Sequence, residues 1–360
     1  MSNNKILEVL KLTLANWFKD SELDSLYLVG SFTTGEYNNF SDIDLLGITK
    51  NKNETVNAIA YRKYLQHLIN KIEDYRNINI GLRLRHSSEL IKFNNHMCSW
   101  GYNNINAKLL FGNKVNWNIA EYESTPSKLL DNINVELRYY NQKYSKMKNK
   151  NEILYCNCKG ILNALHFYLI SKGVQLYTHE DRVAFAITYK MIPNHILSKS
   201  ILMYCLNSKL GKRQSDSIEI DIDRHNFLVF TFYEILKVKE VGQYEKSKTY
   251  WGIFRDDNQT INIIKKLHIE KDLFRPETIR RYSYRILLFL FLVSVDKLRL
   301  GCLNSHELFN LNQIQKSFFK PIGKFSRIKD KSDITDFINQ LDKYMFLNDK
   351  QFRDDFSVGE

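Results

Sequence analysis

Over the first 122 residues, segments with the hydrophobic spacing of helices alternate with short runs typical of strands. Apolar residues recur at helical spacing from Lys5 to Phe18 and again from Asn53 to Asp74. Between and after these helices lie short apolar runs that are typical of buried or half-buried strands. These runs are Leu26 to Val29, Ile43 to Ile48, the strictly alternating Ile78 to Leu84, and Ala107 to Gly112. The pattern predicts a mixed sheet with helices.

From about Ser127 onward the pattern becomes helical. The predicted helices are rich in Tyr and Phe, which is usual for a packed bundle, and one of them starts at Pro276. The others cover 128–147, 153–173, 179–191 and 195–210. We therefore predict an α+β chain with three parts: a sheet-containing domain over residues 1–122, a helical domain over 123–241 and a helical C-terminal portion over 242–360.

The sequence shows no pattern typical of a membrane span, a signal peptide or a disulfide framework, and this bears on the cellular location. The most apolar run, Ile286 to Val293, is shorter than the roughly 20 residues that span a bilayer, and it predicts a buried core helix. The N-terminus lacks the order of a signal peptide. Five cysteines without framework spacing favour a reducing compartment. We expect a cytoplasmic protein that does not enter the membrane.

The formal net charge of +12 suits polyanionic partners such as nucleoside triphosphates (NTPs), nucleic acids or anionic surfaces. Basic clusters at 143–150, 275–285 and 320–331 are candidates for contact with a nucleic-acid backbone. Taken singly, each cluster is better explained as a solvated helix face.

The chemistry is concentrated between Val29 and Leu45. A predicted strand ends at Gly30, where the missing side chain lets the backbone approach a phosphate closely. Ser31 then offers a hydroxyl and an N–H group at the start of a short helix, an arrangement that favours phosphate oxygens. Asp42 and Asp44 are two residues apart on the next strand, so both carboxylates project from one face. A divalent cation, Mg²⁺ or Mn²⁺, is the natural partner of such a pair.

This arrangement resembles the DNA polymerase β-like nucleotidyltransferase superfamily, whose pattern is Gly-Ser, a short helix, and Asp-x-Asp on the next strand. Gly30-Ser31 and Asp42-Ile43-Asp44 match that pattern residue for residue. The resemblance covers about the first third of the chain. It implies that Gly30 and Ser31 bind the NTP, expected to be ATP, and that Asp42 and Asp44 bind the metal and are catalytic. The nucleoside monophosphate would pass to an acceptor hydroxyl or phosphate, with release of pyrophosphate.

The acceptor stays open in this interpretation. The helical remainder is similar in general plan to antibiotic nucleotidyltransferases, in which a helical domain completes a small-molecule acceptor site. The net charge favours RNA instead, such as the tRNA end used by nucleotidyltransferase toxins and defence proteins.

One departure from the superfamily pattern concerns the third carboxylate that usually lies on a following strand. The matching strand carries Asn79, Gly81 and Arg83 on its polar face, and none of these is acidic. Glu136 is the first candidate for a base from the helical domain, and Glu121 and Glu123 are the second choices. Alternatively no strong base is needed, or the chain is a catalytically degenerate regulator that binds NTP without turning it over. Arg83 and Arg85 are candidates for contact with the triphosphate, or exposed strand residues.

Other candidate sites are less specific. Glu219, Asp221 and Asp223 alternate like the residues of a strand, but no Gly-Ser turn precedes them, and Asp223 is expected to cap a helix that begins near Arg224. Cys156 and Cys158 are interpreted as helix residues, and the spacing of the histidines does not support a zinc site.

Overall fold

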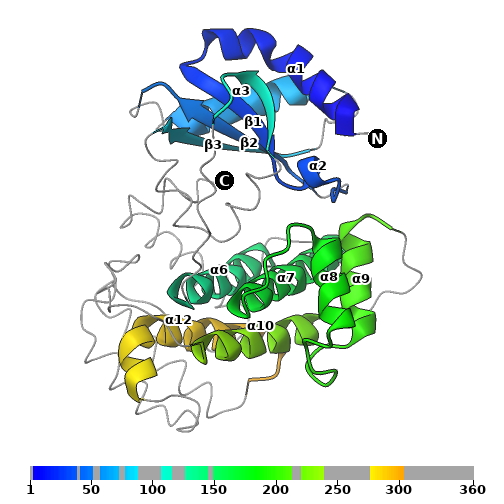
Figure 1. The fold of residues 1–360 in the computed structure, drawn as a ribbon, viewed down its shortest axis with the longest axis vertical. Helices are drawn as coiled ribbons and strands as arrows, with labels where there is room; N and C mark the ends of the chain where they lie inside the picture. The colour runs from blue at the N-terminus through cyan, green and yellow to red at the C-terminus, as the bar shows by residue number, and fades with distance from the viewer. Residues whose placement is uncertain are drawn as a thin grey trace.

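The computed structural model describes residues 3–38, 41–51, 57–72, 78–87, 107–115, 126–144, 149–212, 220–238 and 276–303. Within these ranges a four-stranded sheet with its helices is followed by a bundle of helices (Figure 1). The predicted α+β class is confirmed.

The sheet has the strand order β3-β2-β1-β4. Strand β1 (Leu23–Val29) runs antiparallel to both β2 (Ile43–Thr49) and β4 (Lys108–Gly112). Strand β3 (Ile80–His86) runs parallel to β2, so the sheet is mixed as predicted. The register sets Asp44 opposite Val29 on one side and opposite Gly81 on the other.

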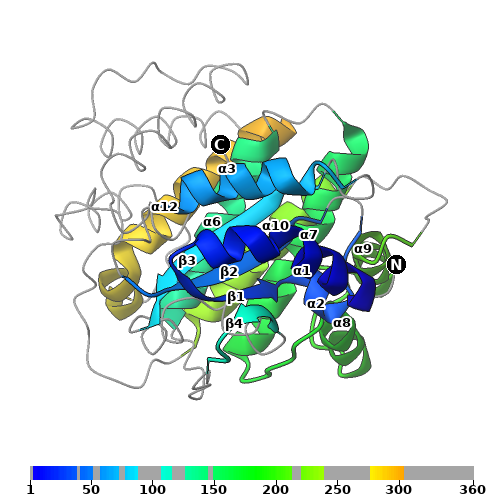
Figure 2. The ribbon, with the colours of Figure 1, turned by 90° about the horizontal axis from the view of Figure 1, so that it is seen from above.

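The two faces of the sheet differ in what covers them. Helices α1 (Asn3–Asp20) and α3 (Ala58–Ile69) pack on one face through a core that includes Leu14, Leu45 and Leu82. The other face carries a smaller apolar group of Tyr27, Val29, Leu46 and Ile48. Figures 1 and 2 show that this second face is turned towards the helical bundle. Because side chains alternate along a strand, Asp44 lies on that face with Leu46.

The bundle is built around one apolar core that spans sequence positions from Leu129 to Val295. Its helices are α6 (Pro126–Tyr144), α7 (Lys150–Ser171), α8 (His179–Thr188), α9 (Lys199–Lys209), α10 (Asp221–Leu236) and α12 (Pro276–Leu300). The predicted helix start at Pro276 and the predicted core helix around Ile286 are both confirmed in α12. The proposed boundaries near residues 122 and 241 lie outside the described residues and stay predictions.

The expected helix cap at Asp223 is wrong. Helix α10 begins at Asp221 and has Ile220 at its N-cap, so Asp223 lies inside the first turn. The earlier start has a physical reason, because Asp221 has partners on neighbouring helices: it accepts hydrogen bonds from Asn157 on α7 and Arg299 on α12. Acidic residues in a first turn are also favoured by the helix dipole.

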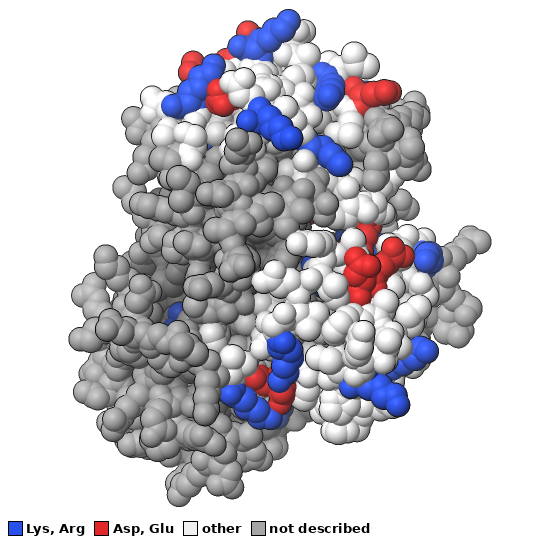
Figure 3. Space-filling view, viewed as in Figure 1, with Lys and Arg blue, Asp and Glu red and all other residues white. Residues whose placement is uncertain are grey.

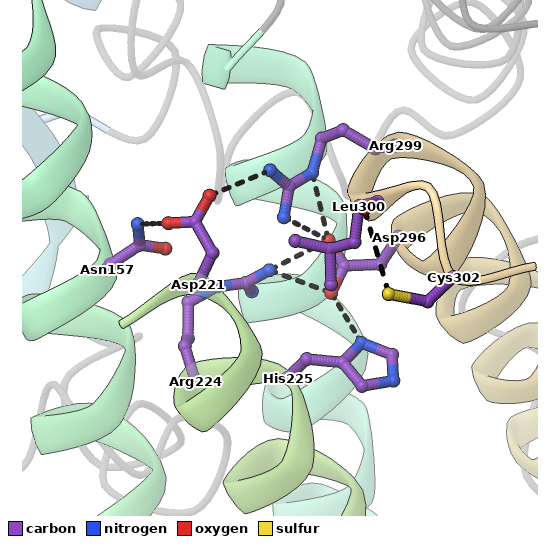
Figure 4. A network of polar contacts seen from close by, with 8 residues as sticks. All are labelled: Asn157, Asp221, Arg224, His225, Asp296, Arg299, Leu300 and Cys302. Atoms are coloured by element: carbon purple, nitrogen blue, oxygen red, sulfur yellow. Dashed lines mark hydrogen bonds and ion pairs between the residues drawn. The ribbon is translucent and has the colours of Figure 1, made fainter. Parts of the chain in front are cut away.

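A buried ionic network joins α10 to α12 (Figure 4). The Asp296 carboxylate is fully buried and accepts hydrogen bonds from Arg224, His225 and Arg299 at 2.7–3.1 Å. The ring of Tyr140 on α6 lies 3.6 Å from the Arg224 guanidinium and 4.7 Å from that of Arg299. These contacts hold the pKa of Asp296 well below its usual range despite its burial.

Among the described residues, no helix has both the length and the apolar character needed to cross a bilayer.

Candidate active site

The Gly30-Ser31 turn is fixed by its own backbone and by one aromatic anchor. Gly30 has a φ of 77°, a left-handed conformation that favours glycine. Its carbonyl accepts hydrogen bonds from the N–H and the hydroxyl of Thr33, at 3.1 and 2.7 Å. Phe32 is buried and stacks on Tyr37 with ring centroids 4.4 Å apart. Ser31, half-buried, therefore starts the short helix α2 (Ser31–Thr34) in a defined position.

The carboxylate of Asp44 lies between two glycines. A Cβ atom placed on Gly30 would stand 2.6 Å from its Oδ2, and one placed on Gly81 would stand 2.6 Å from its Oδ1. Both distances are too short for real contacts, so either side chain would displace the carboxylate. Gly81, one of the positions at which a third acid was expected, therefore lies directly against Asp44.

The charges around Asp44 come from both halves of the molecule. Burial raises the pKa of Asp44 to about 6, and the neighbouring charge of Asp42 adds to the rise. Arg83 on β3, Lys159 on α7 and Lys209 on α9 act in the opposite direction. Asp42 is half-buried and directly precedes β2. The two predicted aspartates thus lie together, with cations of three different elements near them.

The donor set of this pair suits a divalent cation. Two neighbouring carboxylates repel each other, and the raised pKa of Asp44 expresses the cost of ionising it without a partner. Mg²⁺ is usually held by one or two carboxylates together with substrate phosphate oxygens and water, and Asp42 and Asp44 fit that pattern. No group of three or more His, Cys, Asp and Glu side chains placed to hold a metal occurs among the described residues.

Two lysines of the bundle were not identified from the sequence. Lys209 is buried, and its Nζ donates to the Tyr155 hydroxyl at 3.1 Å. Burial alone would raise the pKa of Tyr155, but the charges of Lys159 and Lys209 give a net lowering. A signal existed for Lys159, because it interrupts the apolar run of α7 between Cys158 and Ile161. Its partner Asp44 could not be inferred from that run.

The same charges affect a histidine at the start of α8. Burial holds the pKa of His179 well below its usual range, and Arg182, Lys209, His166 and Lys159 lower it further. His179 is therefore neutral at physiological pH, and the positive charge of this region belongs to the lysines and Arg182.

Glu136, the predicted base, lies on α6 and shares a charged neighbour with Asp44. Its Oε1 accepts a hydrogen bond from Asn163 Nδ2 at 2.8 Å. Burial raises the pKa of Glu136 against the charges of Lys159 and Arg224. Lys159 therefore acts on both carboxylates, whereas Glu121 and Glu123 lie outside the described residues.

Arg83 and Arg85 follow Gly81 on the same face of β3. Arg83 is half-buried and close enough to Asp44 for its charge to lower the pKa of that carboxyl. Arg85 is buried two positions further along, where its carbonyl accepts a hydrogen bond from Thr49. Of the two, Arg83 is the one placed beside the aspartates, and its contact with a nucleotide stays a prediction.

Residues 13–95 match the family model described as a nucleotidyltransferase domain. This part of the chain is a nucleotidyltransferase domain. The resemblance stated from Gly30-Ser31 and Asp42-Ile43-Asp44 is thereby confirmed. The matched range contains all four of these site residues and Arg83, whereas Glu136, Lys159 and Lys209 lie beyond the nucleotidyltransferase domain, in the bundle. No curated protein matches the chain significantly.

Proposed function

We propose that the chain transfers a nucleoside monophosphate from an NTP, with ATP as the first candidate, to an acceptor hydroxyl or phosphate. The observation that carries this proposal is the position of Asp44. Its carboxylate lies against the backbone of Gly30, beside Asp42, and in the field of Arg83, Lys159 and Lys209. A nucleotidyltransferase domain with this constellation has the groups that a triphosphate needs, namely a phosphate-binding turn, a metal-binding pair and compensating cations.

In this proposal the β- and γ-phosphates lie against Gly30 and Ser31. Arg83, Lys159 and Lys209 reduce the repulsion between the phosphates and the aspartates. Asp42 and Asp44 would hold Mg²⁺ or Mn²⁺, which when bound supplies charge neutralisation at the reacting phosphate and at the leaving pyrophosphate. An acceptor oxygen attacks the α-phosphorus, and the bond to the β-phosphate oxygen breaks.

The acceptor proton goes to Glu136 in our proposal. A carboxylate whose pKa is raised by burial is a better base than an exposed one, and Asn163 orients it. Phosphoryl-group transfer also proceeds without a strong base when positioning and charge neutralisation suffice. In that alternative, water receives the proton and Glu136 serves only to position Lys159.

Small molecules and RNA are both candidate acceptors. The bundle supplies Lys159, Lys209 and Glu136 from the side opposite the sheet, which suits a small acceptor held between them. The net charge of +12 suits RNA. On the face drawn in Figure 3, the described Lys and Arg residues are scattered over the sheet domain and the bundle rather than gathered in one band. This distribution does not strengthen the case for RNA on that face.

A second candidate function is an NTP-binding regulator without turnover. The observation in its favour is Gly81, which lies opposite Asp44 in the parallel register where an additional acid would stand. This candidate predicts NTP binding with no pyrophosphate formed.

The decisive experiment measures pyrophosphate release from each of the four NTPs with Mg²⁺, with and without total cellular RNA. The variants are Asp42→Asn, Glu136→Gln and, as a matched control, Glu180→Gln, which removes an exposed carboxylate of α8. We expect Asp42→Asn to lose activity by at least about 100-fold and to keep its fold. Full activity in Asp42→Asn would refute the assignment, and NTP binding without release by the wild type would favour the regulator.

Glu136→Gln distinguishes the two accounts of the proton. If Glu136 is the base, kcat falls by about 100-fold or more and the acidic limb of the pH–rate profile is lost. If it only positions Lys159, the profile keeps its shape and the loss is expressed mainly in KM.

A further inference from the structure

The segment that links the Gly30-Ser31 turn to the aspartates also contacts the helical bundle. Two of its side chains, Glu36 and Asn38, form hydrogen bonds with helices whose sequence positions lie about 140 to 170 residues further on. Each bonds to a different helix, and each bonds to a helix end. We call this pair the clasp.

Glu36 binds the start of α8. Its side chain is buried, and its Oε1 accepts hydrogen bonds from the N–H groups of His179 at 2.6 Å and Glu180 at 3.1 Å. The first amides of a helix have no carbonyl partner inside the helix, and they carry its positive dipole end. Thr178 satisfies a third amide of the same turn, that of Asp181. The Glu36 carboxylate therefore completes the cap of α8 from another domain.

Asn38 binds the end of α9. Its Nδ2 donates to the carbonyl oxygens of Ser208 at 3.0 Å and Lys209 at 3.1 Å, in the last turn of the helix, where carbonyls lose their usual helical donors. The Ser208 carbonyl also accepts from the N–H of Gly211 at 3.2 Å. Gly211 makes this approach possible, since a Cβ atom there would lie 3.2 Å from Cβ of Asn38. Asn38 is itself oriented by Ser41, whose hydroxyl accepts from the Asn38 N–H at 3.0 Å.

The chemistry of the two contacts is complementary to the two helix ends. An acceptor meets the N–H end of α8, and a donor meets the carbonyl end of α9. Together the two contacts of the clasp hold the segment that carries Glu36 and Asn38 against the bundle. One of them ends on Lys209, whose ammonium group acts on Asp44. Lys209 thus accepts a hydrogen bond from Asn38 at its backbone carbonyl, while its ammonium group donates to Tyr155 and is one of the positive charges near Asp44 and Glu36.

We propose that Glu36 and Asn38 are positioning residues, which fix Lys209 relative to Asp44 by holding the segment between the Gly30-Ser31 turn and the aspartates against α8 and α9. This inference rests on the proposed function, because Lys209 matters only where a triphosphate binds. It adds that the two domains form one site only while the clasp is closed. Small displacements of groups around a reacting phosphate cost up to about 100-fold in rate, so the clasp has a measurable effect.

The first test is hydrogen exchange at the amides of His179 and Glu180, which the helix itself cannot protect. Glu36→Ala should speed exchange in the peptide covering residues 177–181. Glu36→Gln should leave it slow, because the amide oxygen still accepts. The control Asp20→Asn, which removes an exposed carboxylate of α1 outside this peptide, should not change it. Unchanged exchange in Glu36→Ala would show that the contact does not persist in solution.

The second test is the kinetic effect. Glu36→Ala and Asn38→Ala are each expected to lower kcat/KM for MgATP by about 10- to 100-fold, with Glu36→Gln recovering most of the loss. Thermal unfolding of each variant separates this effect from global destabilisation. Faster exchange with unchanged kcat/KM would overturn the positioning role.

A double-mutant cycle decides whether the clasp acts through Lys209. Lys209→Met should cost clearly less in the Asn38→Ala background than in the wild type, and additive losses would overturn the proposal. The dissociation constant for MgATP serves in the same cycle if turnover is absent. A wild-type protein that neither binds MgATP nor releases pyrophosphate refutes the proposed function and the positioning role together. Exchange at residues 177–181 then still reports whether the contact exists.

Discussion

Asp44 illustrates how one residue combines conflicting requirements. It needs burial to lie against Gly30 and Gly81, yet burial disfavours the ionised form that a metal requires. The protein offsets this only in part, with Arg83, Lys159 and Lys209, so the pKa of Asp44 stays at about 6 rather than near 3.8. Such a carboxylate is stabilised strongly when a cation binds. Strongly shifted pKa values of this kind are common at functional sites.

The raised pKa of Asp44 predicts a pH-dependent stability in the absence of metal. Between about pH 4 and pH 6 the folded protein binds a proton at Asp44 that the unfolded chain has lost, so the free energy of unfolding decreases as the pH rises through this window. Asp44→Asn removes the ionisation. Its Tm should therefore exceed that of the wild type at pH 7.5, and the difference should shrink towards pH 4.

Thermal unfolding from pH 4 to pH 8 with EDTA checks this, with Asp20→Asn at the exposed end of α1 as the control. Added Mg²⁺ should raise the Tm of the wild type and not that of Asp44→Asn. A lower Tm of Asp44→Asn at pH 7.5 would contradict the account.

Among the elements, α10 and α12 are joined by buried ionic contacts. Their contact buries Asp296 with two arginines and a histidine, a set that is stable only as a whole. Gly160 on α7 contributes by leaving room for the Arg224 stem, which a Cβ atom there would approach to 3.1 Å. The network also contacts α6, the helix that carries the candidate base, because Arg224 and Arg299 lie over the ring of Tyr140.

Asp296→Asn should destabilise the fold by about 3–5 kcal/mol, because it leaves Arg224 and Arg299 buried with reduced compensation. Urea unfolding measures this. The control is Glu234→Gln on α10, which removes a partly exposed partner of Lys172 and Lys237 and should cost about 1 kcal/mol or less. Equal losses in the two variants would show that the network adds no more than a surface pair.

For the molecule as a whole, the relation between the two domains is the decisive feature. The aspartates belong to the sheet, the lysines and Glu136 belong to the bundle, and only their combination makes a complete candidate site. The acceptor must therefore reach the region between α6, α7 and the second face of the sheet. Both a small molecule and an RNA end meet that requirement.

Salt dependence separates the two acceptor classes. If RNA is the acceptor, its affinity for the protein should fall by at least about 10-fold between 50 and 200 mM salt, since neutralised phosphates release counterions. Filter binding or fluorescence anisotropy with bulk tRNA measures this. Lys159→Met and Lys209→Met should leave the slope nearly unchanged if these lysines bind the triphosphate rather than the RNA backbone. Weak, salt-insensitive binding would favour a small-molecule acceptor.

The fold was predictable where local patterns carry the information. Alternation along Ile80 to Leu84 identified a strand with one buried face, and helical spacing identified α1. Pro276 and the apolar run from Ile286 identified α12. The start of α10 was misjudged by a few residues, because side-chain partners on α7 and α12 extend it and these are tertiary contacts.

By itself the sequence determined the strands and the chemistry along them. A period of two places Asp42 and Asp44 on one face, and a Gly-Ser turn after a strand places Gly30 beside them. The tertiary structure alone decided what faces that pair. Lys159 and Lys209 are each more than 110 residues from Asp44 in the chain, and their action on it follows from the packing of α7 and α9. Glu136 on α6 is connected to the pair through Lys159, which acts on both carboxylates. The tertiary structure also explains why a glycine occupies position 81. Only the parallel register of β2 and β3 sets Gly81 against the Asp44 carboxylate.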